Sequence, residues 1–323
     1  MANPNDKELL STLAARQRSK RISFVLTPIF LILSMGIIMC GISTIQSGNT
    51  GLGICILLVG IVAMVFSAKY IERSNKRIDE MKELVGQTVV REIIAERIDI
   101  LQYSPNQYFN PDFIKHCGIL PSYDRSSGSD YISGTYRGVP ITYCDLHLEI
   151  ERDTTDSDGN STTTYDTVFR GPVINLALRQ PLNGYVRIRE RRNPRKEKGF
   201  VSGIVNGAAD LFNIDRSTIE TENAQFNQQF KVDTSDPQLA FYILTPQFME
   251  HIVQADTIVN GYTNIEFEQN VVTLALNNGV DLFELGKIKK NDSFLDEARQ
   301  RFRYELNAIL SIVDEMLTKE NLF

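Results

Sequence analysis

The most constraining feature of the chain is a stretch of 47 residues, Ile22–Ala68, that contains no Asp, Glu, Lys or Arg. A helix needs about 20 apolar residues to cross the hydrocarbon core of a bilayer. The stretch therefore predicts two crossings, at about Ile22–Ile45 and Gly51–Ala68, joined by the uncharged turn Gln46–Thr50. A cleaved signal peptide fits poorly. The apolar core of a signal peptide spans only about 7–15 residues, whereas the apolar stretch here is longer and a second crossing follows the first.

The charges beside this stretch predict its orientation. Residues 1–21 hold five basic and two acidic groups, and four basic residues between Lys69 and Arg77 follow the second crossing, whereas the turn has none. Cytoplasmic flanks carry the excess of Lys and Arg. We therefore expect a multi-pass protein of the inner (cell) membrane, with both termini and the main domain in the cytoplasm. No charge lies inside the crossings, which disfavours a channel or transporter.

The overall charge is −6, and the chain after residue 21 carries −9, because the first 21 residues contribute +3. This balance argues against nucleic acid as a partner. The predicted organisation has four parts: an N-terminal segment (1–21), a two-helix transmembrane anchor (22–68), a helical stalk or linker (69–101) and a cytoplasmic domain (102–323). The stalk ends in an apolar stripe from Val89 to Leu101 that is typical of a helix.

The pattern after residue 101 predicts an α+β domain with a mainly antiparallel sheet and flanking helices. Strands are expected to begin near Asp130. Two hairpins are expected, one turning at Arg137-Gly138 and one at Gln269-Asn270. Further strands are expected at Thr167–Leu178, Tyr185–Arg191 and Phe226–Val232, with Glu151–Asp166 as a polar connection. Helices are expected after Asp236-Pro237 and Thr245-Pro246, where a capping residue precedes a proline, and at Phe294–Leu317.

No residue pattern indicates catalysis, a cofactor or a metal. His116, Cys117, Cys144 and His147 are zinc-type ligands, but Cys144 and His147 are an odd number apart on a predicted strand and so face opposite sides. The chain lacks a nucleophile elbow, a Walker loop and a dinucleotide fingerprint. Residues 156–160 contain two aspartates in a calcium-loop-like order without the closing glutamate, and a hairpin tip explains them better.

The segments Gly128–Gly138 and Val139–Glu149 resemble a bacterial domain-of-unknown-function family numbered 3137. Phe169–Gly171, Asn227–Val232 and Leu244–Glu250 extend this resemblance, which spans roughly residues 76–285. The resemblance implies a two-pass membrane protein encoded near membrane proteins of the LemA family, and it implies no activity. Relatives often have Ser-Glu where this chain has Cys144-Asp145, which counts against a role for that cysteine.

A basic segment followed by an apolar one is the candidate site. The basic part alternates arginines on a strand and continues into a turn, and the apolar part has helical spacing. Three interpretations remain open: a helix packed on its own sheet, an interfacial helix on an anionic leaflet, or a groove for a partner helix. The residues of this candidate lipid or partner surface are Arg187, Arg189, Arg191, Arg192, Arg195, Lys196, Lys198, Phe200, Val201 and Ile204.

Taken together, these features favour a membrane-anchored, non-enzymatic interaction or scaffold domain that recruits a protein partner at the inner membrane face. By the family resemblance that partner is LemA-like. The alternatives are a membrane-associated enzyme of unknown class and an anionic-lipid-sensing domain. The sequence leaves the oligomeric state open.

Overall fold

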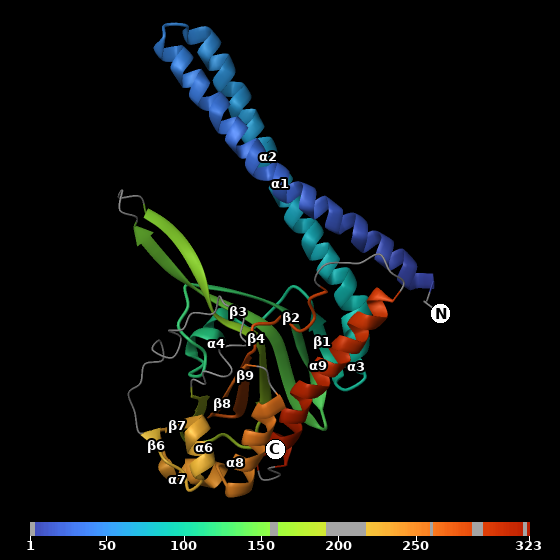
Figure 1. The fold of residues 1–323 in the computed structure, drawn as a ribbon, viewed down its shortest axis with the longest axis vertical. Coiled ribbons are helices and arrows are strands. Elements are labelled where there is room, and N and C mark those ends of the chain that lie inside the picture. Colours follow the sequence, from blue (N-terminus) through green and yellow to red (C-terminus); the bar gives the residue numbers. More distant parts are fainter. Residues whose placement is uncertain (1–3, 156–160, 192–217, 259–260, 286–292, 319–321) are drawn as a thin grey trace. The chain divides into compact units, whose positions relative to one another are not determined.

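The computed structural model describes residues 4–155, 161–191, 218–258, 261–285, 293–318 and 322–323 (Figure 1). The chain divides into two compact units. The first comprises residues 1–85 and 285–298, and the second comprises residues 86–284 and 299–323.

The first unit is dominated by a helical hairpin. Helices α1 (Pro4–Gln46) and α2 (Thr50–Val85) run side by side and are joined by a turn in which Gly48 has a φ of 94° (Figure 1). The turn lies where the sequence predicts it. A Cβ atom at Gly41 would collide with Leu57, and one at Gly60 with Ile38, so these glycines allow the two backbones to approach closely. Gly36 makes no such approach, because nothing lies within 4 Å of its Cβ position.

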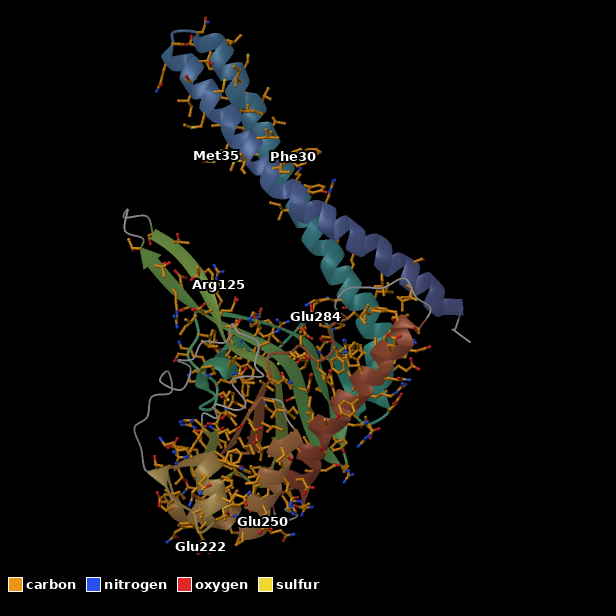
Figure 2. The ribbon with its side chains drawn as sticks, viewed as in Figure 1. Phe30, Met35, Arg125, Glu222, Glu250 and Glu284 are labelled. Atoms are coloured by element: carbon orange, nitrogen blue, oxygen red, sulfur yellow. The ribbon has the colours of Figure 1, made fainter. Side chains whose placement is uncertain are left out.

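One helix among the described residues, Thr50–Arg73, is long and apolar enough to cross a membrane. The described apolar part of α1, Ile32–Gln46, is shorter than a crossing. Large apolar side chains of both helices are exposed, with Ile32 and Phe66 each 72% accessible. Phe30 and Met35 also project outward from the hairpin (Figure 2).

The described residues of the second unit form one nine-stranded antiparallel sheet with the strand order β1-β2-β3-β4-β9-β8-β5-β7-β6. The α+β class and the antiparallel sheet that the sequence predicts are confirmed. The strands are β1 (Asp99–Ser104), β2 (Arg125–Tyr136), β3 (Val139–Thr155), β4 (Ser161–Ala177), β5 (Tyr185–Glu190), β6 (Thr218–Ile219), β7 (Phe230–Thr234), β8 (Tyr262–Glu268) and β9 (Val271–Asn277).

Short and long helices flank the sheet. A π-helical turn, η1 (Gly86–Val90), leads into the remaining helices, which are α3 (Arg91–Ala95), α4 (Pro111–His116), α6 (Ala224–Gln229), α7 (Pro237–Ile243), α8 (Pro246–Ile258) and α9 (Phe294–Leu317). The predicted caps form: the Asp236 side chain accepts a hydrogen bond from the Gln238 amide at 2.9 Å, and Thr245 precedes α8. Helix α9 has the predicted bounds and a continuous buried face.

The two faces of the sheet have different cores. The α4 segment (residues 109–120) covers one face, where it packs on Cys144, Leu146 and Leu148 of β3. On the other face of β3, Tyr143 contacts Phe283, and Phe283 contacts Phe302 of α9, with ring centroids 6.0 and 5.5 Å apart. This alternation along β3 decides which side chains can meet above and below the sheet.

Four predictions about single elements are wrong. The stripe from Val89 to Leu101 is helical only to Ala95, because residues from Asp99 pair with β2, and Leu101 is 87% exposed on β1. The first strand is therefore β1, not one near Asp130. The expected connection Glu151–Asp166 is largely strand, since β3 and β4 stay paired from Glu149–Thr167 out to Thr155–Ser161.

The expected strand Phe226–Val232 begins as helix α6. The Asn223 side chain accepts a hydrogen bond from the Phe226 amide at 3.0 Å, which caps the helix and competes with strand formation. The ring of Phe226 then stacks on Phe230 at 5.0 Å, and β7 starts at Phe230.

Candidate functional site

The arginines of the predicted basic face lie beneath the α4 segment. Arg187 of β5 donates from Nε to the Glu266 carboxylate of β8 and stacks on the Tyr185 ring at 4.1 Å. The Gly118 amide donates to both oxygens of Glu266, at 3.0 and 3.1 Å. A Cβ atom at Gly118 would collide with the Arg187 guanidinium, so the segment can cover this pair only with glycine there.

Arg189 extends the same network. Its Nη1 lies 2.8 Å from Asp233 Oδ2, and its Nη2 donates to the Gly118 carbonyl at 3.1 Å. Burial raises the pKa of Glu266, and Arg187 counteracts this by stabilising the charged carboxylate. We call Arg187, Arg189, Asp233 and Glu266 the arginine cluster. The two guanidinium groups form ion pairs with carboxylates of the same domain.

The rest of the candidate surface is only partly described. Arg191 is exposed, and its Nε donates to the carbonyl oxygens of Asn227 and Phe230 at 3.0 and 3.2 Å. The other candidate residues lie outside the described residues, and so does the calcium-loop-like segment 156–160. They are Arg192, Arg195, Lys196, Lys198, Phe200, Val201 and Ile204.

The structure places the four zinc-type residues in separate environments. Cys117 and Cys144 are buried in the apolar core beneath α4, where burial raises the pKa of both thiols. His116 bonds the Asp112 carbonyl at 2.7 Å, and His147 lies 2.8 Å from the Thr167 hydroxyl. As expected from the strand period, Cys144 and His147 point to opposite faces of β3.

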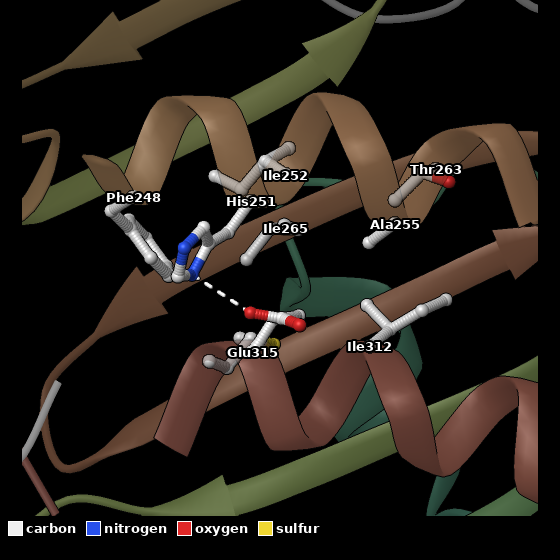
Figure 3. A pocket seen from close by; sticks show the side chains of 9 residues that line it. Phe248, His251, Ile252, Ala255, Thr263, Ile265, Ile312 and Glu315 are labelled. Carbon is white, nitrogen blue, oxygen red and sulfur yellow. Dashed lines mark ion pairs between the residues drawn. The ribbon is translucent and has the colours of Figure 1, made fainter. Parts of the chain in front are cut away.

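A small pocket lies between α8, β8 and α9 (Figure 3). His251 of α8 forms an ion pair with Glu315 of α9 at 2.8 Å, and the remaining lining is mostly apolar. The cavity itself holds about 10 Å³, roughly the room that one water molecule needs. Ligand pockets typically enclose roughly 300–1,000 Å³, so this pocket is small for a substrate, and a single ion pair does not supply a catalytic constellation.

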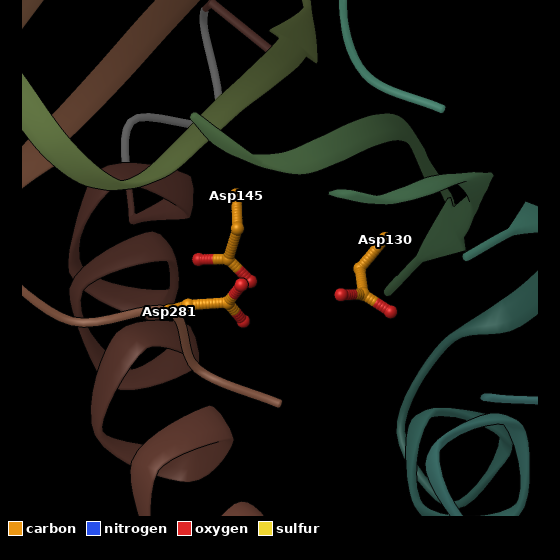
Figure 4. Close-up of side chains that lie close together, drawn as sticks. All are labelled: Asp130, Asp145 and Asp281. Carbon is orange, nitrogen blue, oxygen red and sulfur yellow. The ribbon is translucent and has the colours of Figure 1, made fainter. Parts of the chain in front are cut away.

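Among the described residues, three aspartates come close together: Asp130, Asp145 and Asp281, which we call the aspartate cluster (Figure 4). One carboxylate oxygen from each lies within 4.8 Å of the others. Asp130 and Asp145 are buried and Asp281 is half-buried. Burial, followed by the charges of Asp281 and Asp130, raises the pKa of Asp145 well above its ordinary value. Sequence reasoning missed this site.

A β-bulge builds the aspartate cluster. Strand β2 has one residue more than β3 between the pairs Ser129–Asp145 and Ile132–Tyr143, and Asp130 takes a φ of 57° there. The Asp130 amide donates to the Pro105 carbonyl at 3.1 Å instead of to β3. Bulges of this kind redirect side chains, and this one holds Asp130 toward the loop after β9 that carries Asp281.

The sequence contained one signal for this site. Asp130 and Asp145 are equally distant from the Arg137-Gly138 turn, so a regular hairpin would place two carboxylates directly opposite each other on one face. Like charges in that position are destabilising, so a regular pairing there is disfavoured. The contribution of Asp281 could not be read from spacing, because it lies on a distant loop.

Comparison with known families gives one match. Residues 167–317 match the model of a family described as "Protein of unknown function (DUF3137)". This range contains Phe169–Gly171, Asn227–Val232 and Leu244–Glu250, and it begins after the segment Gly128–Glu149. No curated protein matches the chain.

Among solved structures, the chain is similar to the crystal structure of the mycobacterial trehalose monomycolate transport factor A, TtfA. The two share 13% sequence identity with a TM-score of 0.31, and the alignment covers 70% of this chain and 95% of the other. A likeness at this level carries no argument about the function of the present chain.

Proposed function

We propose that this chain, which belongs to the DUF3137 family through residues 167–317, is a membrane-anchored interaction protein that recruits a protein partner to the membrane surface. The observation that carries the proposal is the helix Thr50–Arg73, which is apolar, long enough to span a bilayer and lined by many large, exposed apolar side chains. Exposed apolar surface of this extent is unfavourable in water and favourable in lipid.

Helix α1 supplies the second crossing in this proposal. Its described apolar part packs on α2 through close approaches at Gly41, Gly53 and Gly60. Small residues at a helix contact are typical of transmembrane packing, where lipid removes the hydrophobic drive between helices. The uncharged stretch Ile22–Ala68 is long enough for two crossings, and the basic residues on both its flanks favour a cytoplasmic location for the second unit.

The β3–β4 arm is the described element best suited to contact a partner. We define it as residues 151–155 and 161–165, which continue the two strands beyond their neighbours β2 and β9 (Figure 1). Nearly all of its residues are exposed. Two contacts brace its base: the Arg125 guanidinium lies 3.3 Å from the Tyr165 ring centroid, and Arg152 pairs with Asp166 at 2.8 Å.

An isolated two-stranded ribbon is marginally stable in water. These exposed polar contacts therefore stabilise a surface that contributes nothing to the domain core. Both edges of the arm are without a sheet neighbour among the described strands. An extended partner segment could pair with either edge. A LemA-family protein is the first candidate to test, because the family resemblance implies neighbouring genes.

The test is photo-crosslinking of the full-length chain in its native membrane, with the crosslinker at Thr163. In the arm variant, Asp153–Thr163 is replaced by Asn-Gly, and the crosslinker is placed at Thr164 instead. Arg152 and Thr164 face each other in the register, so a two-residue turn closes the shortened hairpin. As a matched control, Gln269-Asn270 of the β8–β9 hairpin is replaced by the same turn in a chain with an intact arm.

We expect one defined protein adduct that survives in the control and disappears in the arm variant. An adduct that persists without the arm would refute the arm as the contact element. If no protein adduct forms, and the chain without its transmembrane helices binds anionic vesicles in a salt-sensitive way, the lipid interpretation wins. That binding should then require Arg191, Arg192, Arg195 and Lys196, which are tested by substitution with Gln.

A further inference from the structure

The aspartate cluster has no role in the proposed function, and its chemistry points elsewhere. We propose that Asp130, Asp145 and Asp281 bind one divalent cation through their carboxylate oxygens. All three ligands are hard oxygen donors, the type that Ca²⁺ and Mg²⁺ prefer. Zn²⁺ sites, in contrast, typically use thiolate and imidazole ligands. The proposal is independent of membrane anchoring and of any protein partner.

The distances suit a single ion. Ca²⁺–oxygen bonds are about 2.3–2.6 Å long, so two ligands on opposite sides of the ion are roughly 4.6–5.2 Å apart and adjacent ligands are closer. The three ligand oxygens of the cluster all lie within 4.8 Å of one another. Figure 4 shows the carboxylates of Asp145 and Asp281 meeting, with the carboxylate of Asp130 facing them.

A second observation at Asp145 points to a missing ligand. Its side chain is 3% exposed, and its Oδ1 atom has no hydrogen-bond partner. Buried carboxylate oxygens are ordinarily satisfied by a donor or a metal ion. A buried, unsatisfied oxygen beside two further carboxylates is what the ligand shell of a cation looks like without its ion.

Hydroxyl groups orient the three carboxylates from separate elements. Tyr103 of β1 donates to Asp130 at 2.6 Å, Tyr143 of β3 donates to Asp145 Oδ2 at 2.9 Å, and Ser129 of β2 donates to Asp281 Oδ2 at 3.2 Å. Each hydroxyl satisfies one oxygen of its carboxylate. This pattern matches the outer-shell hydrogen bonds that fix metal ligands in place.

Burial favours Ca²⁺ over Mg²⁺ at this site. Mg²⁺ requires a regular octahedron and keeps several of its waters, whereas Ca²⁺ accepts irregular shells with more protein oxygens. Here the ligands come from three separate segments, the β2 bulge, the middle of β3 and the loop after β9, and an irregular shell accommodates them more readily than a regular octahedron does. An ion there would hold the loop after β9 to the β2–β3 hairpin.

The experiment uses Tb³⁺, which reports on Ca²⁺ sites by luminescence when a nearby aromatic ring transfers energy to it. The chain has no Trp, so tyrosines provide the signal, and Tyr103 and Tyr143 are bonded directly to the ligands. Full-length protein in neutral detergent is stripped with chelator and titrated with Tb³⁺. Bound Tb³⁺ is then displaced with Ca²⁺ or with Mg²⁺.

We expect saturable luminescence with one ion per chain, displaced by Ca²⁺ at concentrations at least 10-fold lower than by Mg²⁺. Asp145→Asn and, as a milder loop variant, Asp281→Asn should each weaken Tb³⁺ binding at least 10-fold. Asp256→Asn, which changes a buried aspartate of α8 outside the cluster, should leave it unchanged. Circular dichroism checks that each variant is folded.

One result would overturn the proposal, and a second would overturn only the choice of Ca²⁺. The proposal is overturned if the wild-type chain binds no more Tb³⁺ than the folded Asp281→Asn variant does. The carboxylates would then be satisfied by protons or by an ammonium group of the chain itself. Displacement by Mg²⁺ at lower concentrations than Ca²⁺ would retain the site and reverse the choice of ion.

Discussion

Two groups of buried charges lie on opposite faces of the same sheet, and they differ in composition. The arginine cluster, beneath the α4 segment, contains both carboxylates and the guanidinium groups that pair with them. The aspartate cluster, on the face that Tyr143 shares, consists of three carboxylates with hydroxyl donors. The first should therefore be stable in plain buffer, whereas the stability of the second should respond to divalent cations and to pH.

The largest effect is expected from removing a cation from the arginine cluster. Arg187→Ala leaves Glu266 buried beside Gly118 without its main counter-charge. Removing one partner of a buried pair costs roughly 3–5 kcal/mol, and the partial exposure of Arg187 favours the lower end, about 3 kcal/mol. Urea unfolding measures the loss. Adding Glu266→Gln to this variant should restore part of it, and no restoration would mean that lost packing dominates.

The next effect is expected from adding a cation to the aspartate cluster. Ca²⁺ at 100 times its dissociation constant should stabilise the chelator-treated wild type by about 2.7 kcal/mol, because it binds the folded state alone. Thermal unfolding with and without Ca²⁺ measures this. Asp145→Asn should remove the gain, while Arg187→Ala should keep it. An equal gain in Asp145→Asn would place the ion elsewhere.

A pH dependence should separate the clusters further. Because the pKa of Asp145 is raised in the folded state, the folded chain holds this proton more tightly than the unfolded chain does. Its contribution to stability is therefore fully present below the unfolded pKa of about 3.9 and is lost as the pH rises through the folded pKa. In chelator, Asp145→Asn should flatten this decline in unfolding free energy, and saturating Ca²⁺ should oppose it. An unchanged slope in Asp145→Asn would show that another group titrates.

The smallest effect is expected at an exposed pair, which calibrates the buried ones. Arg303 donates to both oxygens of Glu96 at 2.6–3.0 Å, and both side chains are more than a third exposed. Such pairs contribute roughly 0–1 kcal/mol. Arg303→Ala should therefore lower the unfolding free energy by less than about 1 kcal/mol. A loss comparable to that of Arg187→Ala would show that burial is not what separates the two pairs.

Sequence reasoning succeeded where the determinants were local. Arg137-Gly138 fixed a hairpin register, Asp236 capped a helix before Pro237, and the apolar spacing of Phe294–Leu317 predicted α9 to the residue. It failed where a distant partner or a competing cap decided the outcome. Leu101 fits a helical stripe in the sequence, but its segment pairs with β2 in the structure. Asn223 caps helix α6 where a strand was expected.

The candidate site shows the same limit. Alternation on β5 predicted a face lined by arginines, but it could not show that Glu266 and a glycine from the α4 segment would cover Arg187. The aspartate cluster needs three segments far apart along the chain, and only the symmetry of Asp130 and Asp145 about their turn was visible beforehand.

Because of the bulge in β2, the aspartate cluster depends on the exact number of residues between Asp130 and the Arg137-Gly138 turn. Two residues, Asp130 and Tyr131, lie opposite Cys144 alone. If the codon for Tyr131 were deleted, the strand period of two would place Asp130 across from Cys144 and turn its carboxylate into the apolar core beneath α4. An in-frame loss of one codon would thus do more harm than most substitutions there. In related genes, the spacing between this aspartate and the Arg137-Gly138 turn should tolerate changes of residue but not of number.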